Sequence, residues 1–481
     1  MALLSSAILS VKWSSISQIA RQALQILTTI ILAKTLSPSD FGLMSMAMVV
    51  IGFLNIFRDL GTSSAIIQRH DLSEKLLSSI FWVNVVFGTV VTLVVYLFAP
   101  MVASFYNEMR LTFVLKLLSA SFLISSIGIT QQALLERKLE FTKLAKVEIA
   151  ATLFGAVVGI TLAFSGAGVW SLVFQALSTA LVSTILLFLF FSNWRPALLF
   201  DFTEIRKVAR FSLNLSGFNI TNYVVRNADY LLIGKFLGAQ ELGYYSLAYR
   251  IMLYPLQNVT AVISRVMFPV YSRIREDNNK FRSAYLDVAG IIALITFPMM
   301  LGMMGVSDYF VVVFFGEKWR VVSLLLIIFS PVGLLQSIEA TTGAIYLVQN
   351  RTDWMFRWGI GTGLFTVVCF VVGLRWGIVG VALSYLVATL IGTYPCFRIP
   401  FTLIDLKVSD LIKKLWKPFF CSLLMLCTIY VGALTLSPAL SKGATLTVLF
   451  ILGISSYYAA SQLFLRKEIA QVLSWLRESL A

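Results

Sequence analysis

The sequence predicts an all-α polytopic membrane protein of about fourteen membrane-spanning helices, with an internal duplication. Three observations support this prediction: the composition, the succession of long apolar runs, and a stretch near the N-terminus that returns in the middle of the chain. Of the 481 residues, 58% are hydrophobic and only 13% are charged. Soluble domains carry about 25% charged residues, so most of this chain is suited to lipid.

An apolar run of about 20 residues is long enough to cross a bilayer as a helix. Such runs follow one another along the chain, and no polar stretch between them is long enough to form a separate soluble domain. The N-terminus has no basic region ahead of its first apolar run, so it is interpreted as mature sequence and not as a signal peptide. The predicted spans are residues 11–33, 41–57, 77–99, 113–135, 147–164, 169–191, 210–237, 243–270, 286–306, 321–347, 355–374, 378–398, 418–437 and 444–465.

Residues 15–47 return as residues 216–248. The clearest stretch is LAKTLSPSDFGLMSMA against IGKFLGAQELGYYSLA. The identical pairs are Ser15/Ser216, Ile19/Ile220, Lys34/Lys235, Leu36/Leu237, Gly42/Gly243, Ser45/Ser246 and Ala47/Ala248. A second, collinear match aligns Leu153, Phe154 and Val157 with Leu364, Phe365 and Val368. Two collinear matches indicate a duplicated half, and in membrane chains such repeats are typical of transporters whose substrate path lies between the repeats.

The net charge of +15 is distributed over short loops. The clusters are Arg137/Lys138/Lys143/Lys146, Arg206/Lys207/Arg210, Arg273/Arg275/Lys280/Arg282 and Lys407/Lys413/Lys414/Lys417. With the N-terminus in the cytoplasm, all four clusters fall on the cytoplasmic side, as the positive-inside rule predicts. We therefore expect an even number of spans and both termini in the cytoplasm. Nucleic-acid binding is excluded, because it needs bases clustered on a folded polar surface.

The cysteines and the histidine are too few and too scattered to indicate a metal site or a catalytic site. Cys369, Cys396, Cys421 and Cys427 all lie in or beside apolar spans, without a CxxC pair, and His70 is the single histidine. We expect free, buried thiols and neither a metal centre nor a His-based catalytic triad.

Polar residues inside the spans are the candidate functional residues. In the first span, one helical face carries Gln18, Arg21, Gln22 and Gln25, which follow i, i+3, i+4, i+7 spacing. Its repeat partner, the seventh span, carries a similar stripe of Asn219, Asn222, Arg226 and Asp229. A charge near the bilayer centre costs roughly 2.5–3.5 kcal/mol on insertion scales, so both stripes are expected to face each other or water.

These stripes have two interpretations. In the first, they line a hydrated central cavity between the halves, where Arg21 and Arg226 face an anionic substrate. Guanidinium groups suit phosphate because their planar fork donates two parallel hydrogen bonds. In the second, Arg226 pairs with Asp229 to neutralise a structural helix while Arg21 reaches the interface. Arg250, in the eighth span, is a further cavity candidate.

Glu339 and Asp229 are the two carboxylates that lie well inside the predicted spans of the second half. Gln336 and Thr342 lie near Glu339 in the tenth span. Either carboxylate could bind a coupling proton or sodium ion; Glu339 could equally cap a broken helix near Gly333 and Gly343.

Glycines and prolines punctuate several spans. Gly155/Gly159 and Gly359/Gly363 have the small-xxx-small spacing that allows helices to approach closely. Pro255 can kink its helix by removing a backbone hydrogen bond. After the last span, residues 466–481 predict an amphipathic helix on the inner leaflet, with a partner-binding role as the alternative.

Four stretches together resemble the polysaccharide-synthesis, oligosaccharide-flippase branch of the multidrug/oligosaccharidyl-lipid/polysaccharide exporter superfamily, and most closely the Wzx-type exporters of the colanic-acid kind. They are ILAKTLSPSDFGLMSMA, QQALLERKLEFTKLAKVE, NADYLLIGKFLGAQELGYYSLAYR and VMFPVYSRIRED. The likeness covers nearly the whole chain.

The resemblance implies two pseudo-symmetric six-helix lobes around a central cavity, followed by two further helices. We map the lobes to residues 1–200 and 201–400, the last two helices to 401–465, and the cytoplasmic tail to 466–481. It implies a bacterial inner-membrane flippase that moves undecaprenyl-diphosphate-linked oligosaccharide repeat units by alternating access, for O-antigen, capsule or exopolysaccharide synthesis. Cations of the cavity engage the anionic substrate in this superfamily, and Arg21 and Arg226 are the best-placed candidates. The implied partners are the lipid-linked oligosaccharide, membrane lipids, a polysaccharide polymerase and glycosyltransferases.

Two alternatives belong to other functional classes. A cation-coupled multidrug exporter of the same superfamily would need an acidic, aromatic cavity, whereas the polar stripes here are basic. A membrane polymerase or glycosyltransferase would need catalytic groups in a sizeable loop. The longest loops, at about 58–76, 192–209 and 399–417, are short and carry no DxD pair. We therefore expect a transporter and not an enzyme, without an organic cofactor, and with proton or sodium coupling left open.

Overall fold

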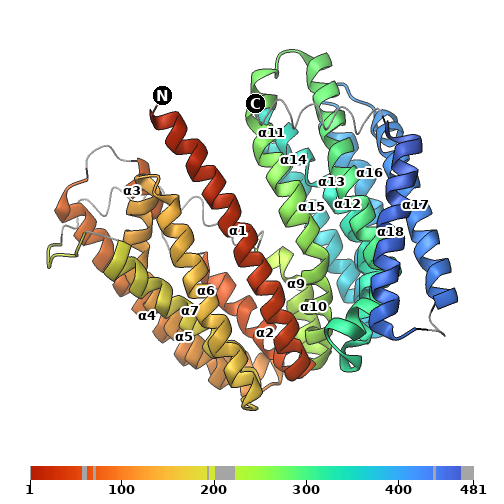
Figure 1. Cartoon of the computed structure of the whole chain (residues 1–481). Coiled ribbons are helices and arrows are strands. Elements are labelled where there is room, and N and C mark those ends of the chain that lie inside the picture. Colours follow the sequence, from red (N-terminus) through yellow and green to blue (C-terminus); the bar gives the residue numbers. More distant parts are fainter. Residues whose placement is uncertain are drawn as a thin grey trace. The chain divides into compact units, whose positions relative to one another are not determined.

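The computed structural model describes residues 2–56, 62–68, 72–191, 194–200, 223–436 and 440–466, and these form helices joined by short turns. They fall into two compact units, Met1–Gly243 and Tyr244–Ala481. The boundary lies inside one helix, directly after Gly243. Figure 1 follows the helices of each unit along the chain.

The first unit is built from long helices that pack pairwise. Contacts join α1 to α6, α4 to α5, α5 to α7 and α6 to α7. The helices are α1 (Ala2–Thr35), α2 (Pro38–Asn55), the short α3 (Thr62–Gln68), α4 (Glu74–Tyr106), α5 (Arg110–Arg137), α6 (Phe141–Phe164), α7 (Val169–Leu186) with the π-helical turn η1 (Leu187–Phe191), α9 (Ala228–Phe236) and the first turn of α10 (Ala239–Pro255).

Local chemistry sets the ends of these helices. At the start of α2, the Ser37 hydroxyl accepts from the Asp40 backbone N–H, and the Asp40 carboxylate accepts from the Ser37 N–H. This reciprocal pair satisfies two backbone donors that have no partner within the helix. At the start of α4 the Ser73 hydroxyl accepts from the Leu76 backbone N–H, and Asn107 ends that helix in a left-handed conformation.

Close helix approach in the first unit depends on glycine. A Cβ at Gly155 would lie 2.0 Å from the Thr179 hydroxyl oxygen, and one at Gly159 would lie 2.9 Å from Gln175. The predicted close packing at this pair is therefore confirmed for α6 against α7. At Gly359, by contrast, a Cβ would meet no described atom within 4 Å, so this glycine makes no close helix contact within the described part of the chain.

Two repeat-related glycines meet where α2 packs on the first turn of α10. A Cβ at Gly42 would lie 1.6 Å from the carbonyl oxygen of Ala239, and one at Gly243 would lie 1.9 Å from the carbonyl oxygen of Pro38. Each glycine thus touches the residue four positions before the other. Hydrogen on Cα can form weak bonds to carbonyl oxygens at such contacts, and any side chain would separate the two backbones.

The second unit continues α10 through a π-helical turn. Pro255 ends α10 and η2 follows directly, consistent with the predicted effect of a proline that lacks a backbone N–H. Contacts join α12 to α13 and α17, α13 to α16, α15 to α16, and α17 to α18. The elements are η2 (Leu256–Thr260), α11 (Ala261–Arg273), α12 (Asn278–Phe314), η3 (Glu317–Trp319), α13 (Val321–Glu339), α14 (Thr342–Val348), α15 (Thr352–Gly373), η4 (Leu374–Trp376), α16 (Gly377–Phe401), α17 (Val408–Leu436) and α18 (Lys442–Phe464).

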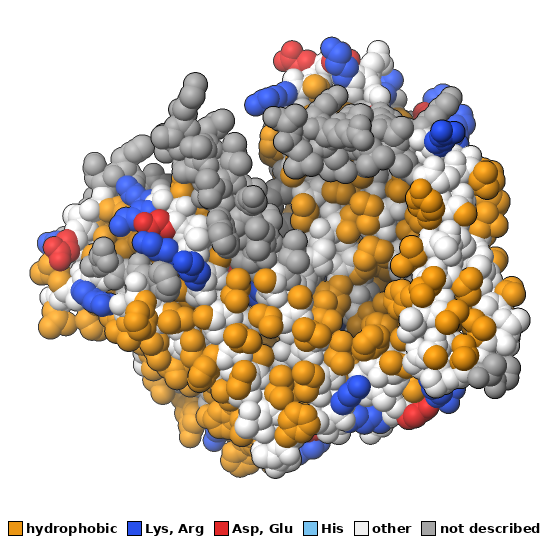
Figure 2. Space-filling model, in the orientation of Figure 1, with side chains coloured by type: hydrophobic (Ala, Val, Ile, Leu, Met, Phe, Trp, Pro, Cys, Tyr) orange, Lys and Arg blue, Asp and Glu red, His pale blue; other side chains and the backbone are white. Residues whose placement is uncertain are grey.

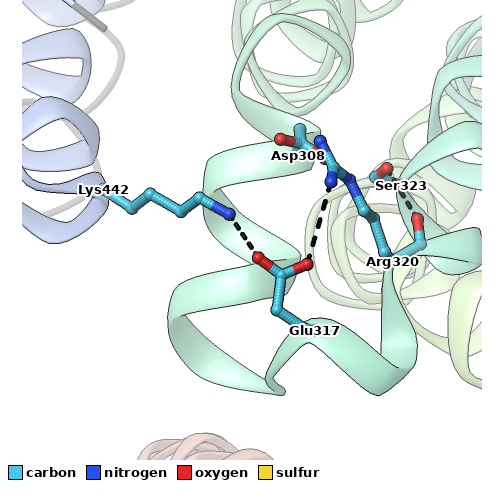
Figure 3. A network of polar contacts seen from close by, with 5 residues as sticks. All are labelled: Asp308, Glu317, Arg320, Ser323 and Lys442. Carbon is cyan, nitrogen blue, oxygen red and sulfur yellow. Dashed lines mark hydrogen bonds and ion pairs between the residues drawn. The ribbon is translucent and has the colours of Figure 1, made fainter. Parts of the chain in front are cut away.

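A polar network ties together one end of this unit (Figure 3). Glu317 accepts a hydrogen bond from Lys442 at the start of α18 and also pairs with Arg320, whose Nε lies 3.2 Å from Oδ1 of Asp308 on α12. The hydrogen bond from Lys442 holds the pKa of the Glu317 carboxyl below its usual range. These exposed pairs join the ends of three helices and contribute little each.

The predicted all-α polytopic membrane chain is confirmed. Among the described residues, 11 helices are long and apolar enough to cross a membrane, and one of them, Thr352–Phe401, contains two predicted spans. The first predicted span lies within α1, and residues 210–222 of the seventh lie outside the described residues. Hydrophobic side chains cover the middle of the visible face, whereas Lys and Arg gather near helix ends (Figure 2). The lobe boundaries near residues 200 and 400 stay predictions, and the amphipathic tail lies outside the described residues except for Arg466.

Candidate transport site

Within the described residues, the polar stripe of α1 forms an ion pair with a carboxylate of another helix. Arg21 Nη1 lies 2.8 Å from Oε2 of Glu148 on α6, and the two side chains keep 36% and 42% of their surface exposed. Gln18 and Gln22 are half-buried, and Gln25 is exposed. An acidic residue of α6, Glu148, therefore lies beside the predicted stripe, and the residue spacing within α1 could not reveal it.

Further along the stripe, hydroxyl groups satisfy their own helix. Thr28 donates to the carbonyl of Leu24, and Thr29 donates to that of Gln25, both at 2.7 Å. These two hydroxyls are therefore engaged along α1, whereas the guanidinium and the glutamine amides of the stripe carry further N–H donors.

The stripe of the seventh predicted span is described only in part. Asn219 and Asn222 lie outside the described residues. Arg226, two residues before the start of α9, is exposed. Asp229 is buried, and its Oδ1 accepts from the backbone N–H of Tyr230 at 2.8 Å. The two interpretations of this stripe, a cavity-facing Arg226 and an Arg226–Asp229 ion pair, stay predictions.

In the second unit, Arg250 is exposed on α10. Deeper in this unit, Glu339 is the last residue of α13, and the helix breaks directly after it, between α13 and α14. The hydroxyl of Thr393 on α16 lies 2.6 Å from Oε1 of Glu339 and also lies 2.7 Å from its own helix carbonyl at Thr389. A half-buried carboxylate thus sits at a break in a membrane-spanning helix, with a hydroxyl donor beside it.

Polar side chains continue around this break. Gln336 donates to the Tyr385 hydroxyl at 2.5 Å. On the other side, the hydroxyls of Tyr285 and Thr341 lie 2.7 Å apart. Tyr385 also packs against Tyr249, with ring centroids 6.2 Å apart. The sequence indicated Gln336 and Glu339 but not their partners, because threonine and tyrosine are common in apolar helices and carry no spacing signal.

The four cysteines are free thiols, as predicted, but only Cys421 is fully buried and Cys427 is exposed. In the part of the chain that the structure describes, no group of three or more His, Cys, Asp or Glu side chains could hold a metal ion.

Comparison with known proteins places the chain in a family. A family model described as polysaccharide biosynthesis protein matches residues 31–324. The lipopolysaccharide biosynthesis protein WzxC of Escherichia coli (strain K12) is 30% identical over 448 residues, covering 92% of this chain and 90% of WzxC. The teichuronic acid biosynthesis protein TuaB of Bacillus subtilis (strain 168) is 28% identical over 424 residues, covering 86% of each chain.

Solved structures show the same fold. The lipid II flippase MurJ, in an inward closed conformation, aligns with a TM-score of 0.76 and 18% identity over 95% of this chain and 99% of MurJ. An inward-facing multidrug resistance MATE family transporter aligns with a TM-score of 0.64 and 16% identity over 82% of this chain and 96% of its own. The protein therefore belongs to the polysaccharide biosynthesis protein family, is similar to WzxC over nearly its whole length, and has the fold seen in the MurJ flippase and in MATE family transporters.

Proposed function

We propose that this protein moves an undecaprenyl-diphosphate-linked oligosaccharide repeat unit from the cytoplasmic to the outer face of a bacterial inner membrane. The sugar and diphosphate enter a central cavity that opens inward and then outward, while the polyprenyl tail stays in lipid. The product serves O-antigen, capsule or exopolysaccharide synthesis, together with glycosyltransferases and a polymerase. The relatives named for lipopolysaccharide and teichuronic acid synthesis support this substrate class.

The observation that carries the proposal is the polar stripe of α1. Its guanidinium, at Arg21, stands among three glutamines on a helix of a membrane chain, and it keeps about a third of its side chain exposed. A diphosphate is the part of the substrate that a guanidinium fork recognises best. Arg226 and Arg250 are the further candidate cations, with Gln18, Gln22, Gln25, Asn219 and Asn222 as candidate sugar contacts.

We also propose that inward-to-outward exchange is coupled to a proton or sodium ion bound at a carboxylate. Glu339 is the stronger candidate, because the Thr393 hydroxyl and the broken helix surround it with polar groups. Asp229 is the second candidate, since it is buried near the start of α9.

Complementation of a flippase-deletion strain tests the cationic site. Arg21→Ala and Arg226→Ala are each expected to lower surface polysaccharide at least tenfold, because each removes a charge-assisted contact to the diphosphate. The matched control is Arg351→Ala, which removes an exposed arginine that pairs with Asp353 at a helix start. Wild-type polysaccharide levels in both cavity variants would exclude the cationic site.

A further inference from the structure

We propose that Glu148 is a displaceable counter-ion that reserves Arg21 for a diphosphate. This inference rests on the proposed function, and it assigns a role to a residue on a different helix from the polar stripe. The observation is the 2.8 Å ion pair between Arg21 on α1 and Glu148 on α6.

Glu148 lies where α6 enters its apolar stretch, as the second residue of the predicted span 147–164. It is the eighth residue of α6, about 10 Å along the helix axis from Phe141 at 1.5 Å per residue. This is beyond the Lys143 that pairs with Glu140 near the start of the helix. A carboxylate at this depth needs a cation or water, and among the described residues Arg21 is its ion-pair partner.

The pair is accessible, which distinguishes it from a sealed structural ion pair. More than a third of each side chain remains exposed. A guanidinium has five N–H donors, and the ion pair with Glu148 is made through Nη1. Donors therefore remain for an incoming anion before the carboxylate leaves.

The exchange of Glu148 for an incoming anion at Arg21 selects a diphosphate over a singly charged anion. A singly charged anion competes poorly with a carboxylate that is already 2.8 Å from the guanidinium and tethered to the protein. A diphosphate offers more charge and several oxygens, which suit bidentate binding. Once it has taken Arg21, the released Glu148 carboxylate repels the bound anion, which keeps the site from holding its substrate too tightly for release.

The experiment uses the full-length protein in detergent micelles and two probes, farnesyl diphosphate and farnesol. The wild type is expected to bind the diphosphate but not the alcohol. Glu148→Gln is expected to lower the Kd for farnesyl diphosphate about three- to fivefold, since it removes a competitor of exposed ion-pair strength. Arg21→Gln is expected to raise that Kd at least tenfold.

The matched control is Glu140→Gln, which removes the same charge from the start of α6, where Glu140 pairs with Lys143. It is expected to leave the Kd within about twofold of wild type. The inference is overturned if Glu148→Gln leaves the affinity unchanged or weakens it, which a purely structural pair predicts, or if Glu140→Gln tightens binding equally. Equal binding of the diphosphate and the alcohol by the wild type would instead contradict the proposed anionic substrate, and this inference would fail with it.

Discussion

Glu339 places an acidic group where a membrane-spanning helix is interrupted. Its neighbours Thr393 and Gln336 come from α16 and α13, and each makes a hydrogen bond of 2.6 Å or less. An acidic residue inside a membrane-spanning segment is a candidate for proton or ion binding, because an ionised side chain is energetically costly in the bilayer. A substitution at Glu339 can therefore test ion coupling of transport separately from substrate binding.

We expect Glu339→Gln to lower surface polysaccharide in the complementation assay about tenfold, the scale of a typical coupling free energy. Its affinity for farnesyl diphosphate should stay within about twofold of wild type, because the substitution leaves Arg21 untouched. The control is Glu317→Gln, which alters an exposed carboxylate in the same unit. Full polysaccharide production by Glu339→Gln would show that coupling does not use this group.

At the residue scale, the sequence could indicate charged and amide side chains but not their partners. Helical spacing predicted the stripe of α1, because one face of a helix recurs at i, i+3 and i+4. The pairing of Arg21 with Glu148 could not be read in the same way. It depends on the packing of α1 against α6, two helices that are far apart in the sequence.

At the element scale, the contact between α2 and α10 depends on the absence of two side chains. Gly42→Ala and Gly243→Ala are each expected to destabilise the protein by about 1–3 kcal/mol, the usual cost of overpacking. The reason is that each new methyl would overlap a backbone carbonyl that cannot rotate away. Thermal denaturation of the detergent-solubilised protein measures the effect.

The control for this pair is Gly361→Ala, in α15, where a Cβ would meet none of the described atoms within 4 Å. It should leave the melting temperature unchanged or raise it, because alanine favours a helix over glycine by about 1 kcal/mol. Equal melting temperatures for all three variants would contradict the importance of the glycine contact.

The helices were predictable in position and less so in extent. All predicted spans within the described residues coincide with helices, because lipid requires every backbone group to be satisfied internally. The helices run further than the apolar stretches; α12, for example, begins at Asn278, eight residues before the predicted span, where Asp277 caps its first turn. The helix break directly after Glu339, at Ala340 and Thr341, lies between Gly333 and Gly343, in the region where the sequence indicated a broken helix.

At the scale of the whole molecule, the distribution of basic residues predicts the orientation. A cysteine-free variant carrying Ser441→Cys should react with a membrane-impermeant maleimide added outside, whereas one carrying Asn279→Cys should not. Both positions lie at the start of a helix, so their local structures are similar. A difference in labelling therefore reports on which side of the membrane each lies. Labelling at residue 279 and not at 441 would invert the topology. Labelling after lysis serves as the control that both thiols are reactive.

The reciprocal glycine contact has a consequence for the origin of the chain. Pro38 and Ala239 are repeat equivalents, as are Gly42 and Gly243, so the contact uses the same patch twice. Self-complementary contacts of this kind are the isologous interfaces of twofold homodimers. Because an even number of predicted spans separates the two copies, both insert in the same direction. The junction thus has the geometry that two identical half-length polypeptides would form by pairing side by side.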